Sequence, residues 1–135
     1  MTTPLALFAR QARLLALREL MNTAGAGIQF YTGIAEPATP ETATAETLLG
    51  TVLFATPSGA IGASGSTATL TITVPRTASA IATGIVGWAR FVTDTGVAVL
   101  DRPCVAVGGT GPIILSDLQV YAGGELQLIS CVISE

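Results

Sequence analysis

The chain has 135 residues, of which 50% are hydrophobic, 5% are aromatic and 11% are charged, against about 25% charged in a typical soluble domain. So few charges leave much neutral surface, which commonly faces another protein. The formal net charge is −3, all six basic residues are arginine and histidine is absent, so the composition excludes the basic face of a nucleic-acid binder and the commonest general base and metal ligand.

Residues 4–21 are predicted to form a helix, with Thr2 or Thr3 as its N-cap and Pro4 near its first position. Its apolar residues fall on two nearly opposite sides, with Leu5, Phe8, Ala12 and Leu15 on one and Leu7, Leu14, Leu17 and Met21 on the other. We expect one side to pack on the protein's own domain and the other to meet a neighbouring subunit. The alternative, a helix lying on a membrane surface, would need a clearer polar face.

Three arginines give residues 1–18 a charge of +3, whereas the remaining residues carry −6. A basic helix on an acidic body would steer docking, although a solvated basic face is the simpler explanation. The candidate interface residues are Leu7, Leu14, Leu17, Met21, Arg10, Arg13 and Arg18.

The next segments read as strands and loops. Residues 28–33 and 48–54 have strand character, and residues 34–47 between them form a loop rich in Pro and Thr. Residues 55–66 are rich in Gly and Ser and are expected to be a long loop or an irregular edge. Residues 67–74 alternate strictly and predict a half-buried antiparallel strand, with Leu70, Ile72 and Val74 on one face and Thr67, Thr69, Thr71 and Thr73 on the other.

A β-hairpin over residues 81–101 is the central prediction. Its first strand has apolar residues in both period-2 sets, so we expect it to be covered on both sides. Turn residues occupy positions 93–96, and Gly96 accepts a positive φ. Trp88, the only tryptophan, is expected to be a core residue.

Residues 103–107 are predicted either to extend the second strand of the hairpin or to begin a new strand. Further short strands are predicted at residues 113–115, 118–121 and 125–134, with a loop over residues 108–112 and a turn over residues 122–124. Seven or eight short strands separated by turns predict a mainly β fold, an antiparallel β-sandwich of jelly-roll or Ig-like type with one N-terminal α-helix. We expect residues 1–24 to be a helical subunit-contact element and residues 25–135 to be a single β-sandwich domain.

No catalytic, cofactor-binding or metal-binding residue is predicted. Cys104 and Cys131 lack a CxxC pattern and are expected to be buried thiols, with a disulfide between them as the open alternative. Asp94, Asp101 and Asp117 would bind Ca²⁺ if they met, but a hairpin turn, a strand end and an Asx turn explain them without metal. No run approaches the roughly 18–20 apolar residues of a membrane span, and the N-terminus lacks the basic start of a signal peptide.

Four segments together resemble small β-rich virion structural proteins of tailed bacteriophages. They are FYTG with the Pro/Thr loop (residues 30–39), TLLGTVLF (residues 47–54), ATGIVGWARFVTDTGVAVLD (residues 82–101) and IILSDLQVYAGGELQLISCVIS (residues 113–134). The resemblance lies in a short Leu/Ala-rich helix, a Trp-x-Arg step before a hairpin turn that here reads Asp94-Thr95-Gly96, and a last strand after a Gly-Gly turn.

The resemblance implies a non-enzymatic minor capsid or decoration protein, made in the host bacterial cytoplasm and located in the virion. Its expected partners are further copies of itself, with a trimer favoured, and the major capsid protein or other virion proteins. Neither nucleic acid nor a membrane is an expected partner. The alternative is a tail, neck or fibre-associated protein with a receptor- or carbohydrate-binding β-sandwich, for which Tyr31, Trp88 and Tyr121 are the candidate aromatic contacts.

Overall fold

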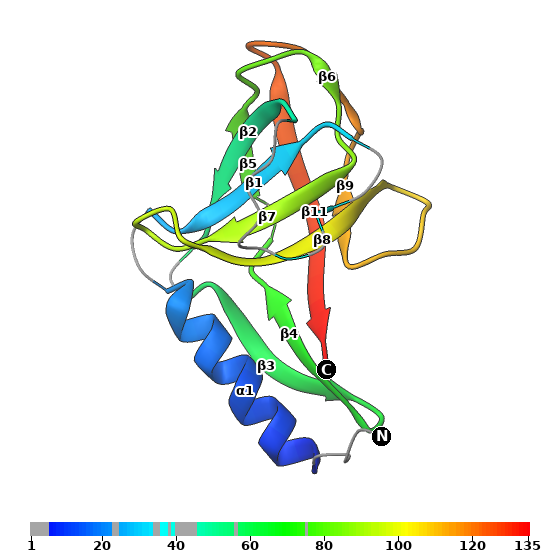
Figure 1. Cartoon of the computed structure of the whole chain (residues 1–135). Helices are drawn as coiled ribbons and strands as arrows, with labels where there is room; N and C mark the ends of the chain where they lie inside the picture. Colours follow the sequence, from blue (N-terminus) through cyan, green and yellow to red (C-terminus); the bar gives the residue numbers. More distant parts are fainter. Residues whose placement is uncertain are drawn as a thin grey trace.

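The computed structural model describes residues 6–22, 25–33, 36–37, 39, 46–55, 57–74 and 76–135 (Figure 1). This part of the chain is mainly β, with one N-terminal helix, α1 (Leu7–Leu20), which confirms the coarse fold prediction. The strands are β1 (Gly27–Tyr31), β2 (Leu48–Leu53), β3 (Gly59–Ser64), β4 (Thr67–Ile72), β5 (Arg76–Ser79), β6 (Gly84–Ile85), β7 (Trp88–Val92), β8 (Ala98–Ala106), β9 (Ile113–Leu115), β10 (Gln119–Val120) and β11 (Glu125–Ser134).

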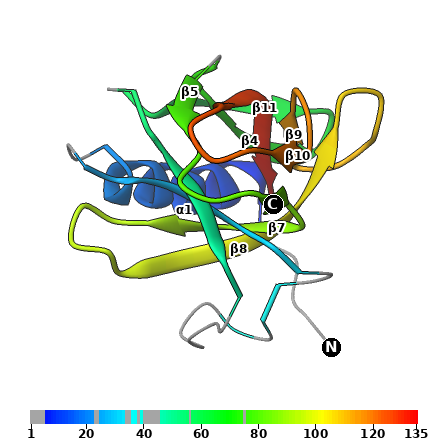
Figure 2. The same ribbon diagram turned by 90° about the horizontal axis from the view of Figure 1, so that it is seen from above.

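Nine strands form one curled sheet in the order β2-β1-β7-β8-β9-β11-β4-β3, with β5 also paired to β11, while β6 and β10 make a separate pair. Seen from above, β7 and β8 lie on one side of the curl and β5, β9 and β11 on the other (Figure 2). The β8–β9 pair is parallel and all other pairs are antiparallel. A sandwich of seven or eight antiparallel strands is therefore not confirmed, because the strands form a mixed, curled sheet.

The curl is nearly closed between β2 and β5. Ile81 lies two residues after the end of β5, and its backbone N–H donates to the carbonyl oxygen of Leu49 in β2 at 2.8 Å. The side-chain Nε of Arg76 donates to the carbonyl oxygen of Leu53 at 3.0 Å. These two bonds occupy outward-pointing carbonyl groups of β2, so this end of the sheet is bridged to the rest of the molecule.

The strands predicted at residues 67–74 and 81–101 are present in the structure. Leu70 and Ile72 of β4 face the core and Thr71 faces out, as the alternation predicts. The hairpin of β7 and β8 is confirmed, and all five residues of β7 are buried. Because β7 lies between β1 and β8 and has both faces covered, it forms the most enclosed strand of the sheet.

Several boundaries differ from the sequence prediction. The expected long first strand of the hairpin is divided into β6 and β7 at Gly87, whose N–H donates to the carbonyl oxygen of Tyr31. Residues 55–66 contain the regular strand β3, and β5 was not predicted. β8 runs through Pro103, where its pairing changes from β7 to β9, so the missing proline N–H removes little from the ladder. The proposed N-cap and Pro4 lie outside the described residues.

Candidate interaction surfaces

The helix α1 is fixed to the hairpin of β3 and β4 and to the end of β11 (Figure 1). Arg10 donates to the carbonyl oxygens of Glu135 and Ser66 at 2.9 and 2.7 Å. Gln11 donates to the carbonyl oxygen of Gly62 at 2.9 Å. These contacts join residues far apart in sequence and set which side of the helix faces the sheet.

The seven candidate interface residues gather on the inward side of α1 or at its margins. Leu14 and Met21 are 2% and 0% exposed in the same core cluster as the strands, and Leu7 and Leu17 are half-buried against that cluster. Arg10 bonds to backbone, as above, while Arg13 and Arg18 form ion pairs with Glu135 and Glu19. The expected interface role of Leu14 and Met21 therefore needs correction, because this chain's own strands already cover them.

The outward side of α1 carries Phe8 and Leu15, two residues of the apolar side that does not contain Leu14 and Met21. Phe8 is 76% exposed, and Leu15 and Leu20 are also exposed. The choice between the two apolar sides could not be made from the helix alone, because both have similar hydrophobicity. It depends on the strands to which the helix is bonded.

A second group of exposed apolar residues lies at the opposite end of the molecule, where Figure 1 places β6. Ile81, Ile85 and Tyr121 are between 61% and 66% exposed. Ile81 and Ile85 come from one segment of the chain and Tyr121 from another. A hydrogen bond joins the two segments, because the N–H of Ala122 donates to the Thr83 hydroxyl at 3.0 Å. The molecule thus has a group of exposed apolar residues at each of two ends, and further exposed apolar residues elsewhere, at Leu53, Val97, Val107 and Ile129.

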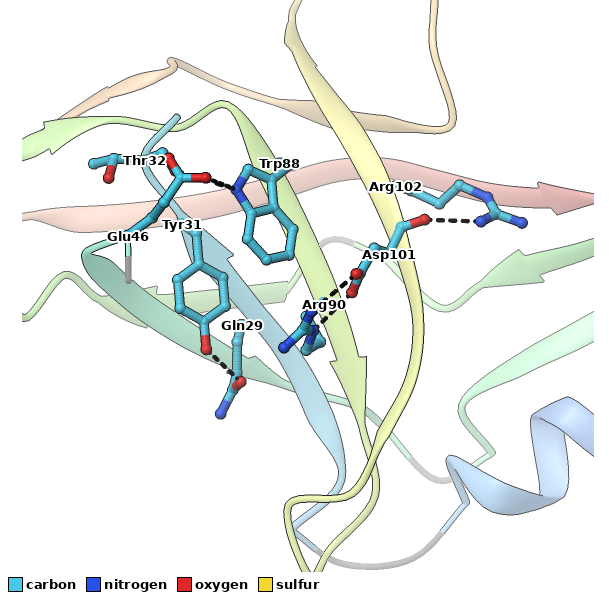
Figure 3. A network of polar contacts seen from close by, with 8 residues as sticks. All are labelled: Gln29, Tyr31, Thr32, Glu46, Trp88, Arg90, Asp101 and Arg102. Carbon is cyan, nitrogen blue, oxygen red and sulfur yellow. Dashed lines mark hydrogen bonds and ion pairs between the residues drawn. The ribbon is translucent and has the colours of Figure 1, made fainter. Parts of the chain in front are cut away.

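A polar and aromatic network covers the outer face of β1, β7 and β8 (Figure 3). Trp88 is 0% exposed, stacks on Tyr31 with ring centroids 4.7 Å apart, and donates from Nε1 to the carbonyl oxygen of Thr32 and to Glu46. The hydroxyl of Tyr31 donates to Gln29 at 2.9 Å, and burial raises the pKa of that hydroxyl. Trp88 is a buried residue, as predicted, and its ring presents no open face to a ligand.

A bidentate ion pair extends this network. Arg90 donates from Nε and Nη2 to the two carboxylate oxygens of Asp101 at 2.8 and 3.0 Å, and both side chains are buried. The guanidinium carbon lies 5.2 Å from the centre of the Trp88 ring. Such a bidentate pair fixes the register of β7 against β8. Each charge is neutralised by the other, so the pair is a structural element of the hairpin.

The three aspartates of the calcium hypothesis are used separately. Asp101 bonds to Arg90, and Asp117 accepts the N–H of Gln119 at 3.0 Å in an Asx turn. Asp94 lies in the exposed β7–β8 turn. Within the described residues, no group of three or more His, Cys, Asp or Glu side chains is close enough to hold a metal ion.

Cys104 and Cys131 are free, buried thiols. Both pair with Ile113, one from each neighbouring strand, so their Cα atoms are two strand spacings apart, about 9.5 Å. A disulfide requires Cα atoms about 4.4–6.8 Å apart. The open alternative of a disulfide therefore does not fit this sheet. Burial raises the pKa of both thiols, with Cys131 at about 12.

One shallow depression, of about 240 Å³, lies beside the turn before β11, and its lining residues are Thr77, Ala78, Ser79, Gly123, Gly124 and Glu125. The N–H of Gly124 donates to the carbonyl oxygen of Tyr121, which places that exposed tyrosine on the same turn. Tyr121 is thus exposed on the turn whose glycines line the depression, and Thr77 and Ser79 contribute hydroxyl groups to that lining.

Comparisons of the chain with protein-family models, with curated proteins and with solved structures found no match. In the described part of the chain, no helix has both the length and the hydropathy needed to cross a membrane.

Proposed function

We propose that this chain is a non-enzymatic structural protein of a tailed-phage virion, a minor capsid or decoration protein that stabilises the shell through protein–protein contacts. The observation that carries the proposal is the apolar surface at two opposite ends of the molecule, Phe8 and Leu15 at one and Ile81, Ile85 and Tyr121 at the other. A free monomer gains nothing from such surfaces, whereas a protein held between neighbours buries them. The four resembling segments supply the virion context.

The mechanism is mechanical. Area buried between neighbouring shell subunits stabilises the assembled state by mass action, without any covalent change. The resemblance favours a trimer as the oligomer. The number of short strands separated by turns favours a β-sandwich as the fold type.

The test is the copy number of this chain relative to the major shell protein, measured by quantitative mass spectrometry of purified phage particles. A ratio near one, or a simple fraction such as a third, is expected for a decoration protein that follows the shell lattice. A ratio of a few per cent would move the chain to the neck, tail or fibre, and its absence from particles would contradict the proposal.

The second candidate, a receptor- or carbohydrate-binding protein of the tail or fibre, is favoured by the position of Tyr121 beside the depression at Thr77 and Glu125. Of its three candidate aromatics, Trp88 is enclosed and Tyr121 is exposed. A glycan array with the native protein and with Tyr121→Ala tests it. Binding that is lost in the variant supports the candidate, and an array without hits counts against it.

A further inference from the structure

The strand β3 ends the sheet and has a free edge. Among the strands of the described residues it pairs only with β4, in an unbroken antiparallel register. The N–H of Thr73 donates to the carbonyl oxygen of Ser58, and that of Ala68 donates across to Glu135 on the other side. Because backbone groups alternate in direction along an antiparallel strand, the N–H and C=O groups of Ile61 and Ala63 point away from β4. Within the described part of the chain, these groups have no hydrogen-bond partner.

This edge lacks the features that usually prevent strand addition. Residues 57–74 contain no charged residue and no proline after Pro57. The pairing of β3 with β4 has no bulge that would twist the edge away. Edge strands in soluble proteins are normally protected by lysine, proline, a bulge or a covering element. An uncharged six-residue edge without a bulge is therefore suited to accept another strand.

The exposed side of α1 is turned toward β3. Gln11 bonds to Gly62 of β3, whereas Arg10 and Arg13 bond to Glu135 beyond β4, so the Gln11 side of the helix is the β3 side. Phe8 and Leu15 lie three residues before and four after Gln11, which puts them on that side. The backbone edge and these two exposed side chains therefore lie on the same side of the helix–hairpin unit.

We propose that this surface binds a second copy of the chain, with β3 pairing antiparallel to β3 of the partner about a twofold axis. A chain of net charge −3 is repelled by its own copies elsewhere, but not across an edge without charges. Head-to-tail pairing of β3 with β2 is disfavoured, because Ile81 and Arg76 already occupy carbonyl groups of the β2 edge. Pairing of β3 with β3 is self-complementary and closes as a dimer.

The β3–β3 contact would be one of the protein–protein contacts of the proposed function, and its biological role rests on that proposal. A twofold contact gives even numbers of chains, so the trimer favoured by the resemblance is compatible with it only as six chains with a separate threefold contact. Particle copy number and the solution contact are independent measurements. A chain that is present in particles yet has an unpaired β3 would contradict this inference alone.

The first experiment combines light scattering with amide hydrogen exchange on the full chain. The expected mass is twice the 13.7 kDa of one chain, or a further even multiple. The amides of Ile61 and Ala63 should be protected at high concentration and lose protection on dilution, while those of Ala68 and Thr73, bonded within the chain, stay protected. A monomer or a trimer, or free exchange at Ile61 and Ala63 in a dimer, would overturn the proposal.

Two variants locate the contact. Ala63→Pro removes an N–H that points outward, so the β3–β4 ladder is kept and the dimer should be lost. Phe8→Glu places two carboxylates near each other across the axis and should raise the dissociation constant at least about tenfold. The matched control is Ala16→Glu, which adds the same charge at an exposed helix position turned away from β3. Equal weakening by Phe8→Glu and Ala16→Glu, with both variants folded by circular dichroism, would refute the assigned surface.

Discussion

Arg90 and Asp101 stand opposite each other on β7 and β8 and form a buried ion pair, with Nε and Nη2 bonded to the two carboxylate oxygens at 2.8 and 3.0 Å. The pair lies on the outer side of the hairpin, next to the stacked rings of Tyr31 and Trp88 (Figure 3). Charges and aromatic rings thus cover the face of β7 that points away from the apolar core.

Removing one member of this pair should destabilise the fold strongly. In Asp101→Ala, the guanidinium of Arg90 stays buried without its partner, which costs about 3–5 kcal/mol. Replacing both residues, as in Arg90→Met with Asp101→Leu, removes the uncompensated charge and should cost much less. Urea unfolding measures both, with the exposed Asp94→Ala as the control, expected within about 0.5 kcal/mol of the native protein. A double variant as unstable as Asp101→Ala would contradict this explanation.

The two sides of α1 should respond differently to truncation. Leu14→Ala opens a cavity in the core shared with the strands and should cost about 2–5 kcal/mol in the free energy of unfolding. Phe8→Ala removes an exposed side chain and should change the stability of the monomer by less than about 0.5 kcal/mol. Thermal unfolding at low protein concentration compares them.

Deletion of residues 1–21 is expected to destabilise the β domain, because Leu14 and Met21 belong to its core. Such a deletion would therefore not separate a loss of assembly from a loss of folding.

Much of the strand order along the chain could be predicted, because local patterns determine it. The alternation around Leu70 and the turn before Gly96 depend only on neighbours in sequence, and both are confirmed. The final strand was predicted over the residues that form β11. In contrast, β5 is short and pairs with β11 far along the chain, and its own residues carry little strand signal.

The arrangement of the sheet could not be predicted, because it depends on contacts between distant residues. Nothing in the spacing of Cys104, Ile113 and Cys131 indicates that the three are neighbours across a mixed sheet. Similarly, the bond from Gln11 to Gly62 decides which side of the helix is exposed. The sequence therefore predicted that α1 has two apolar faces. Which of the two faces is exposed depends on the strands against which the helix packs, and the sequence did not predict it.

The two cysteines should make the fold sensitive to alkaline pH. Burial raises the pKa of both thiols from the ordinary value of 9.0, with Cys131 at about 12. Between about pH 9 and pH 12, the thiols stay protonated in the folded state but lose their protons in the unfolded state. The free energy of unfolding is therefore highest below about pH 9 and falls as the pH rises toward 12. The expected slope is about −1.4 kcal/mol per pH unit for each thiol.

Urea unfolding between pH 8 and pH 10.5 measures that slope. The control is Cys104→Ala with Cys131→Ala, which should be less stable at pH 8 and should lose most of the pH dependence above pH 9. Slow reaction of both thiols with a soluble disulfide reagent in the folded protein is expected from the same burial. Rapid labelling at pH 8 without unfolding would contradict the enclosed position of these side chains.

Gly87 offers a sharp test of the division between β6 and β7. Its backbone passes so close to Gly33 that an added Cβ would overlap the carbonyl oxygen of that residue. Since the obstacle is backbone rather than a flexible side chain, Gly87→Ala should displace the segment that carries the Trp88 hydrogen bonds. The expected result is a loss of about 1–3 kcal/mol, as for other overpacked sites, with a red shift of the tryptophan emission. The matched control is Gly111→Ala, whose Cβ would meet only Val105 side-chain atoms at 3.4 Å, and a stability loss equal to that of Gly87→Ala would contradict the close approach.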